Sequence, residues 1–179
     1  EKMSKSKFNV VNPDDAIAEY GADCLRLFEM FLGPIEDAKP WNTDGISGTY
    51  KFLKRFYHLF FNNDGTSRLT DGEPSPEALK AVHTCIKKVN EDMERFSFNT
   101  CVSAFMICVN ELNNLQTTEQ QALEPLVLLI APFAPHLAEE IWKNALGNSG
   151  HVVSQIEYPV HNPTYLIEST KEYPVSING

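Results

Sequence analysis

The sequence lacks any long apolar run. No stretch approaches the ~20 residues that a helix needs to cross a bilayer, and the first residues do not combine a basic segment with an apolar one, as a secretory signal does. These absences argue against a membrane protein and against a secreted one. We therefore expect a cytoplasmic protein without a membrane partner.

The sequence also has few cysteines and no C-x-x-C pair. Its four cysteines, Cys24, Cys85, Cys101 and Cys108, all lie inside helical patterns. Because ligand spacing is missing, neither a zinc site nor a disulfide framework is indicated. We expect these residues to be small buried apolar side chains, and we predict no metal site.

Positive charge is scarce as well. The chain has 15 Lys and Arg against 24 Asp and Glu, a formal net charge of −9. Because non-specific affinity for nucleic acid comes largely from neutralising phosphates, this balance argues against indiscriminate binding, and we expect no DNA partner. Any contact with RNA must come from a local basic patch.

What the sequence does have is helical periodicity, with 42% hydrophobic residues to form a core. In the first helical segment Asn12 is a candidate N-cap, Pro13 fits the first helical position, and Gly21 is a stop. Asp23 is a candidate cap for a second helix that ends near Gly33. These signals predict two consecutive helices before residue 34.

Longer helices follow. Apolar residues at helical spacing predict a helix over about 46–61 and another over 79–96, whose seam suits packing against antiparallel neighbours. A third long helix follows, capped by Asn99 or Thr100. The sequence therefore predicts a mainly α protein built as an antiparallel helical bundle, in one compact domain with a short appendage.

Residues 118–136 contain two further local signals. Thr118 and Gln121 have the spacing of a capping box, but Pro125 marks either a kink in the following helix or its start. His136 lies near the start of a further helix. Because H-L-A-E-E lacks the second histidine of the inverted zinc motif, we expect His136 to make a local hydrogen bond and to have no metal-binding role.

The last residues change period. Apolar and polar residues alternate over 151–179, which is typical of short strands. The apolar positions are Val152, Val153, Ile156, Tyr173, Val175 and Ile177. We therefore expect short β segments at the C-terminus.

The chain opens on a run of cations and hydroxyls. Residues 2–6 are Lys2, Met3, Ser4, Lys5 and Ser6, and Lys7 follows. Ammonium groups supply charge and serine hydroxyls supply short hydrogen bonds, so a flexible loop of this kind can hold phosphate. A solvated tail is the alternative interpretation.

The helix expected over 46–61 has two different faces. Phe52 and Phe56 belong to an apolar stripe, whereas Lys51, Lys54 and Arg55, with His58 one turn further on, lie on another face. This basic face is the best candidate patch for RNA in an acidic chain. The alternative is a solvated helix surface that only keeps the protein soluble.

The residues named above resemble a known family. The K-M-S-K-S run, N-V-V-N-P-D at 9–14 and Y-G-A-D-C-L-R at 20–26 resemble the signature loop of class I aminoacyl-tRNA synthetases and the helix after it. W-N-T at 41–43, F-N-T at 98–100 and P-F-A-P-H at 132–136 are similar to the leucyl branch. The valyl, isoleucyl and methionyl enzymes share the lysine loop and remain alternatives for the substrate.

The resemblance implies how the chain is organised. In the family the lysine loop closes a catalytic domain, yet no H-I-G-H tetrad and no glycine-rich nucleotide turn occurs here, so we expect a fragment that does not adenylate alone. Residues 1–33 would end the catalytic domain and 34–150 would form the helical tRNA-binding domain of the anticodon-binding type. Residues 151–179 would be a linker and the first strand of a C-terminal domain.

The resemblance also implies site residues. Lys5 would contact the phosphates of ATP, which is used with Mg²⁺ to activate leucine before its transfer to tRNA(Leu). Lys2, Met3, Ser4 and Ser6 would shape the loop. Phe8 stands where the family usually has glycine. This departure bears on how freely the loop closes, because phenylalanine does not take a positive φ cheaply.

The same resemblance supports the basic face, because Lys51 and Arg55 fall where the family commonly places arginines facing tRNA. Lys54 is added from its spacing on the helix alone. A function of another class stays open: an independent helical module that binds RNA or protein and has no adenylation activity.

Overall fold

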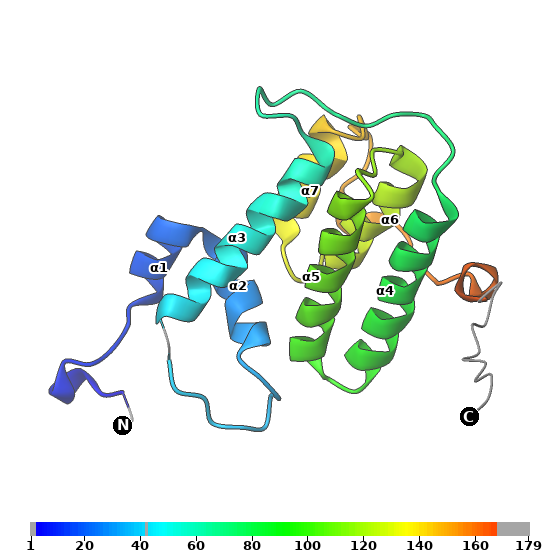
Figure 1. Ribbon diagram of the computed structural model, residues 1–179. Helices are drawn as coiled ribbons and strands as arrows, with labels where there is room; N and C mark the ends of the chain where they lie inside the picture. The colour runs from blue at the N-terminus through cyan, green and yellow to red at the C-terminus, as the bar shows by residue number, and fades with distance from the viewer. Residues whose placement is uncertain (1–2, 42, 168–179) are drawn as a thin grey trace, which may run out of the picture.

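The computed structural model describes residues 3–41 and 43–167, and in these ranges the chain forms seven α-helices and three short 3-10 helices (Figure 1). The α-helices are α1 (Pro13–Tyr20), α2 (Ala22–Phe31), α3 (Thr43–Phe60), α4 (Pro76–Glu94), α5 (Phe98–Asn114), α6 (Gln120–Ile130) and α7 (Pro135–Asn144). The 3-10 helices are η1 (Lys5–Lys7), η2 (Val153–Gln155) and η3 (Pro163–Leu166). The predicted mainly α fold is confirmed.

Helices α4, α5 and α6 form one side of the molecule, with α4 and α5 running antiparallel next to each other (Figure 1). Helices α1 to α3 form the other side, and α2 contacts α3, α5 and α7. The helix α2 therefore joins the N-terminal segment to the bundle.

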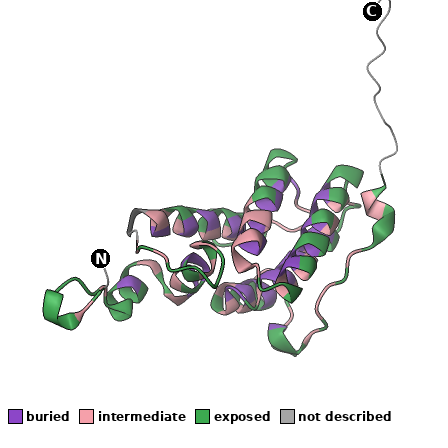
Figure 2. Ribbon diagram, turned by 90° about the horizontal axis from the view of Figure 1, so that it is seen from below, coloured by how far each residue is buried: buried purple, intermediate pink, exposed green. Residues whose placement is uncertain are grey.

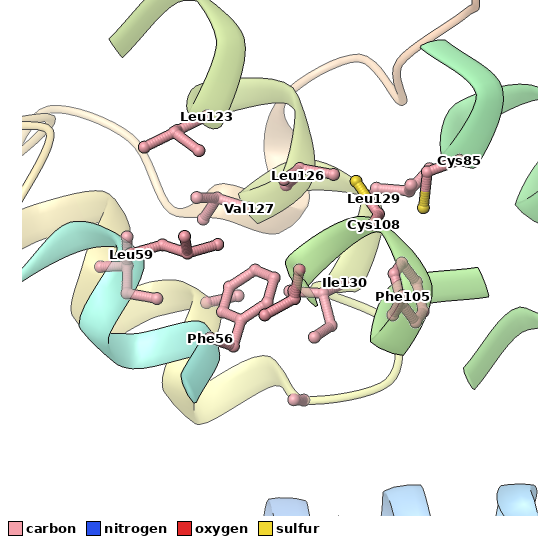
Figure 3. Close-up of a cluster of buried hydrophobic side chains, with 14 of the residues drawn as sticks. Phe56, Leu59, Cys85, Phe105, Cys108, Leu123, Leu126, Val127, Leu129 and Ile130 are labelled. Carbon is pink, nitrogen blue, oxygen red and sulfur yellow. The ribbon is translucent and has the colours of Figure 1, made fainter. Parts of the chain in front are cut away.

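The core lies where these helices face one another, and buried residues line the inner sides of the helices (Figure 2). Phe56 and Leu59 of α3 meet Val127 and Ile130 of α6, with Phe105 of α5 beside them (Figure 3). All five are almost fully excluded from solvent. This arrangement follows from the apolar stripes of the amphipathic helices.

A second, smaller cluster lies between α2 and α3. Cys24 and Phe28 of α2 pack with Ile46 of α3, and Trp41 contacts Phe28 edge-on at a centroid distance of 5.3 Å. Because α2 and α3 also contribute Leu27 and other side chains to the large core, the two clusters share helices.

The predicted start of the first helix is confirmed. The Asn12 side chain accepts a hydrogen bond from the backbone N–H of Asp14, Pro13 is the first helical residue, and Gly21 ends α1 with φ of 88°. The prediction for Asp23 was wrong. Helix α2 begins at Ala22 without a side-chain cap, and the buried Asp23 carboxylate turns toward α7.

The predicted caps of α5 and α6 were also wrong. Helix α5 begins at Phe98 without a side-chain cap, so Asn99 and Thr100 lie inside the helix. The Thr100 hydroxyl donates to the Asp92 carboxylate at the end of α4. Helix α6 follows Glu119, and no capping box forms because Thr118 pairs through its backbone and its hydroxyl with Thr70.

Pro125 lies inside α6 and does not start it. Five helical residues precede Pro125 in α6. Proline lacks only its own backbone N–H, so the other backbone hydrogen bonds of the helix can still form.

The strands predicted near Val152 and Ile156 are absent from the described part of the chain, where this segment forms η2. A strand needs a partner strand, whereas these residues run over α6 and α7. Val153 is buried there, and its N–H donates to the Glu139 carboxylate at 2.9 Å. The positions predicted for a later strand, 173–177, lie outside the described residues.

Candidate functional site

The lysine run forms a short projecting turn at the N-terminal end of the structure (Figure 1). The Ser4 N–H donates to the Asn9 side chain at 2.8 Å, and the hydroxyls of Ser4 and Ser6 are 2.8 Å apart. The side chain of Lys5 is exposed. These bonds hold the turn together while its cation points to solvent, which suits a group that meets a phosphate from outside.

Other predicted loop residues have different surroundings. Met3 is 39% exposed and borders a surface groove with Leu32 and Lys39, whereas Lys2 lies outside the described residues. The loop as described therefore presents Lys5 and Ser6 outward and Met3 toward the chain after α2.

Phe8 ends this turn with a left-handed backbone, at φ of 54° and ψ of 28°. Its side chain is 96% exposed, so no packing compensates for the strain of that conformation. A non-glycine residue there costs roughly 1–2 kcal/mol. Phe8 thus adopts the positive φ for which glycine is the usual residue.

The predicted basic face is present on α3. Lys51, Lys54 and Arg55 are all exposed, while Phe52 and Phe56 on the opposite side of the helix are buried. The Lys54 ammonium lies 4.6 Å from the centroid of the Tyr50 ring, a cation–π contact. The structure thus brings the three predicted cations together on one helix surface.

The groove beside this face was not predicted from the sequence. A groove of about 590 Å³ lies between the junction of α1 and α2, the outer side of α3 and the start of α7. Tyr20, Tyr50 and Tyr57 line it, together with Lys54 and His58. Four of these residues lie on α3 and Tyr20 lies at the end of α1, so the helical spacing over 50–58 was visible beforehand, whereas the approach of Tyr20 was not.

One end of the groove is polar. The Asp23 carboxylate accepts hydrogen bonds from the Nδ1–H of His136 at 2.8 Å and from the backbone N–H of Leu137 at 2.7 Å. The local hydrogen bond predicted for His136 was therefore wrong, since its partner is 113 residues away. Because Nδ1 serves Asp23, the second ring nitrogen of His136, whose side chain is 78% exposed, is left for other partners.

The cysteines behave as predicted and are free and buried. Burial raises the pKa of Cys24 to about 11 and that of Cys101 to about 12. Thiols in this state are poor nucleophiles and poor ligands at neutral pH. Within residues 3–41 and 43–167 there is no cluster of three or more metal-ligating side chains.

None of the described helices is long and apolar enough to cross a membrane. Among the described residues, the cationic turn around Lys5 and the basic, aromatic surface of α3 are the candidate sites. Both offer cations to an anionic partner.

The helical bundle and the lysine–serine turn before it match two family models of tRNA ligases. The profile described as the anticodon-binding domain of tRNA ligase matches residues 76–179, and that of class I tRNA synthetases for I, L, M and V matches residues 1–39. The chain belongs to the family of tRNA-ligase anticodon-binding domains.

Individual relatives narrow the similarity. The chain is 58% identical over all 179 residues to a leucine–tRNA ligase of Flavobacterium psychrophilum and 56% identical to one of Cytophaga hutchinsonii. It spans 18% and 19% of their lengths. The predicted resemblance to leucyl-tRNA synthetases is confirmed.

A solved structure agrees with this similarity. It is the ternary complex of a LeuRS from Agrobacterium radiobacter with tRNA and LeuAMS, and it superposes with a TM-score of 0.77 at 30% identity. The match covers 93% of this chain and 23% of that one. The bundle described above is therefore the arrangement found in a tRNA-bound synthetase.

Proposed function

We propose that this chain is part of a leucine–tRNA ligase, which activates leucine with ATP and transfers it to tRNA(Leu) in the cytoplasm. The observation that carries the proposal is the similarity to leucine–tRNA ligases at 52–58% identity along the whole chain. The relatives favour the leucyl branch over the valyl, isoleucyl and methionyl ones.

The proposed division of labour follows the chain. Residues 1–33 end the catalytic domain, 34–150 form the tRNA-binding helical domain, and 151–179 lead into a C-terminal domain. Because the chain spans about a fifth of its relatives, we expect it to be inactive in adenylation by itself.

Lys5 is the proposed catalytic residue, with Lys2, Met3, Ser4 and Ser6 shaping its loop. When the carboxylate of leucine attacks the α-phosphate of ATP, pyrophosphate leaves, and the Lys5 ammonium stabilises the charge that develops on the phosphate oxygens. Its exposure on a projecting turn supports this role, since the phosphates would be held by the rest of the enzyme.

The loop does not fit a magnesium ion. Residues 3–8 carry cations, hydroxyls and apolar groups but no carboxylate, whereas Mg²⁺ prefers oxygen ligands that include carboxylates. The Mg²⁺ expected with ATP therefore has no ligand set here, and the loop contributes charge of its own.

The proposed tRNA contacts are Lys51, Lys54 and Arg55. Their exposure on one face of α3, in a chain with a net charge of −9, supports a local phosphate-binding surface. Each phosphate contact of this kind contributes roughly 0.7–0.9 to the salt dependence of binding.

The test is leucine-dependent ATP–pyrophosphate exchange by the full-length synthetase that carries this chain. We expect Lys5→Ala to lower the exchange rate about 10²- to 10³-fold, because one preorganised cation is lost from the transition state. Lys87→Ala, an exposed lysine of α4, is the matched control and should leave the rate unchanged.

The outcomes separate the alternatives. Exchange that depends on valine, isoleucine or methionine instead of leucine would overturn the assigned substrate. If none of these amino acids supports exchange, the independent interaction module is favoured. An unimpaired Lys5→Ala enzyme would remove the role of Lys5.

A further inference from the structure

We propose that the groove beside the basic face of α3 holds one unstacked nucleotide of the bound tRNA, with its base against the tyrosine rings and its phosphates on the α3 cations. This inference rests on the proposed function, which supplies the RNA. It adds a binding site for a single nucleotide to a surface otherwise assigned only to backbone phosphates.

The walls of the groove are a set of aromatic rings. Tyr20 and Tyr50 meet edge-on at 5.8 Å, and Tyr57 is stacked on Phe61 at 4.5 Å with an interplanar angle of 23°. These contacts hold the rings before any ligand arrives. Nucleobases stack on such rings whatever their identity, because every base has a π-face.

The positive charge of α3 beside the groove favours a nucleotide over an apolar peptide as the ligand. Lys54 lines the groove while its ammonium lies over the Tyr50 ring, so the basic face and the aromatic wall share this residue. His58 lines the same groove, and Lys51 and Arg55 lie within about one turn of Lys54. In a chain of net charge −9, an apolar groove lined by Lys54, with two further cations nearby on the same helix, complements a ligand with an aromatic ring and a phosphate.

Size and polarity agree with one nucleotide. The volume of about 590 Å³ lies within the roughly 300–1,000 Å³ usual for small-molecule sites. At the polar end His136, held through Nδ1 by Asp23, offers its second ring nitrogen to the edge of a base. The groove thus provides a stacking wall, phosphate contacts and one hydrogen-bonding group.

The experiment measures binding of a tRNA(Leu) transcript to the full-length synthetase that carries this chain, over a range of salt concentrations. We expect Tyr50→Leu to weaken binding about 5- to 150-fold, which is the usual loss for one stacked base, without changing the salt slope. Tyr50→Phe keeps the ring and should retain the affinity. Tyr165→Leu is the control, since Tyr165 stacks on His83 of α4 and does not line the groove.

A variant that reverses the basic face separates the two proposals. Lys51→Glu with Arg55→Glu should weaken binding and reduce the salt slope, because phosphate contacts are lost. If this variant binds like the original synthetase, the proposed tRNA face is wrong. If the Lys51→Glu, Arg55→Glu variant weakens binding while Tyr50→Leu does not, the tRNA face stands and the groove proposal is overturned. The same pair of results is expected if another protein segment covers the groove.

Two further measurements distinguish loss of the binding site from unfolding of the Tyr50→Leu variant. The melting temperature of Tyr50→Leu is recorded by circular dichroism, and the original synthetase is photocrosslinked to a tRNA transcript containing 5-bromouridine. Crosslinks to peptides carrying Tyr20, Tyr50 or Tyr57 support the proposal. Crosslinks confined to other peptides contradict it, whatever the stability of the variant.

Discussion

His83 accepts a backbone hydrogen bond that depends on its protonation state. Its Nδ1 accepts from the N–H of Asn162 at 3.0 Å, and its ring stacks on Tyr165 at 4.6 Å. Burial lowers the pKa of His83 below its ordinary value of 6.5, and the neighbouring His161 lowers it further. This residue therefore attaches the chain around η3 to α4 in its neutral form.

The attachment should weaken in acid. Because the folded pKa lies below the unfolded one, His83 contributes stability above pH 6.5 that is lost as the pH falls through the folded pKa. We expect the hydrogen-exchange protection factor of the Asn162 amide to fall as the pH is lowered from 6.5 through the folded pKa of His83, since imidazolium cannot accept a bond.

Two controls belong to this measurement. The amide of Val89, in the buried middle of α4, should keep its protection over the same pH range. In His83→Gln, whose side chain does not titrate, protection of Asn162 should no longer change with pH. An unchanged protection factor in the original chain would contradict the role of His83.

At the scale of helices, Asp23 joins α2 to α7. The residue at the N-cap position of α7, Ala134, makes no side-chain cap, and the Asp23 carboxylate instead accepts the N–H of Leu137 in the first turn. A negative charge there also favours the helix N-terminus. Arg26 adds a second link from α2 by donating to the carbonyl of Pro132 at 3.0 Å.

We predict that Asp23→Ala lowers the free energy of unfolding by about 1–3 kcal/mol, because the first turn of α7 and His136 lose their common acceptor. Urea denaturation followed by circular dichroism measures this change. Asp71→Ala, an exposed residue of the loop before α4, should change it by less than about 0.5 kcal/mol. Equal changes in the free energy of unfolding for the two substitutions would show that Asp23 does not stabilise the contact between α2 and α7.

At the scale of the whole molecule, the two apolar clusters depend on one another. Helix α2 places Phe28 in the small cluster and Leu27 in the large one, and α3 likewise contributes Ile46 to the first and Phe52 to the second. Because α2 and α3 contribute to both clusters, unfolding of either helix removes side chains from both. Unfolding of one should therefore unfold both.

The two tryptophans test this coupling, since Trp41 packs against the small cluster and Trp142 belongs to the large one. In Trp41→Phe and Trp142→Phe the remaining indole reports on one cluster at a time. We expect circular dichroism and fluorescence to give coincident urea transitions within each variant. A fluorescence transition that clearly precedes the loss of helix in either variant would show separate units.

Features that depend on near neighbours in the chain were predictable. The Asn12 cap and Pro13 at the start of α1 act within a few residues, and the faces of α3 follow from the period of the helix. The short strands near Val152 were mispredicted because a strand depends on a partner that is distant in the chain. Their alternation of apolar and polar residues is the same whether a partner strand or the surface of α6 and α7 covers them.

The sequence by itself thus determined the helical fold, the cationic turn at Lys5 and the basic face at Lys51 and Arg55, because each rests on spacing within one segment. It also determined the family resemblance, through short motifs that follow one another along the chain. The tertiary structure alone decided the pairing of Asp23 with His136 and the tyrosine groove beside Lys54. Those features join residues that are far apart in the chain, and only the packing of α2, α3 and α7 against one another brings them within contact distance.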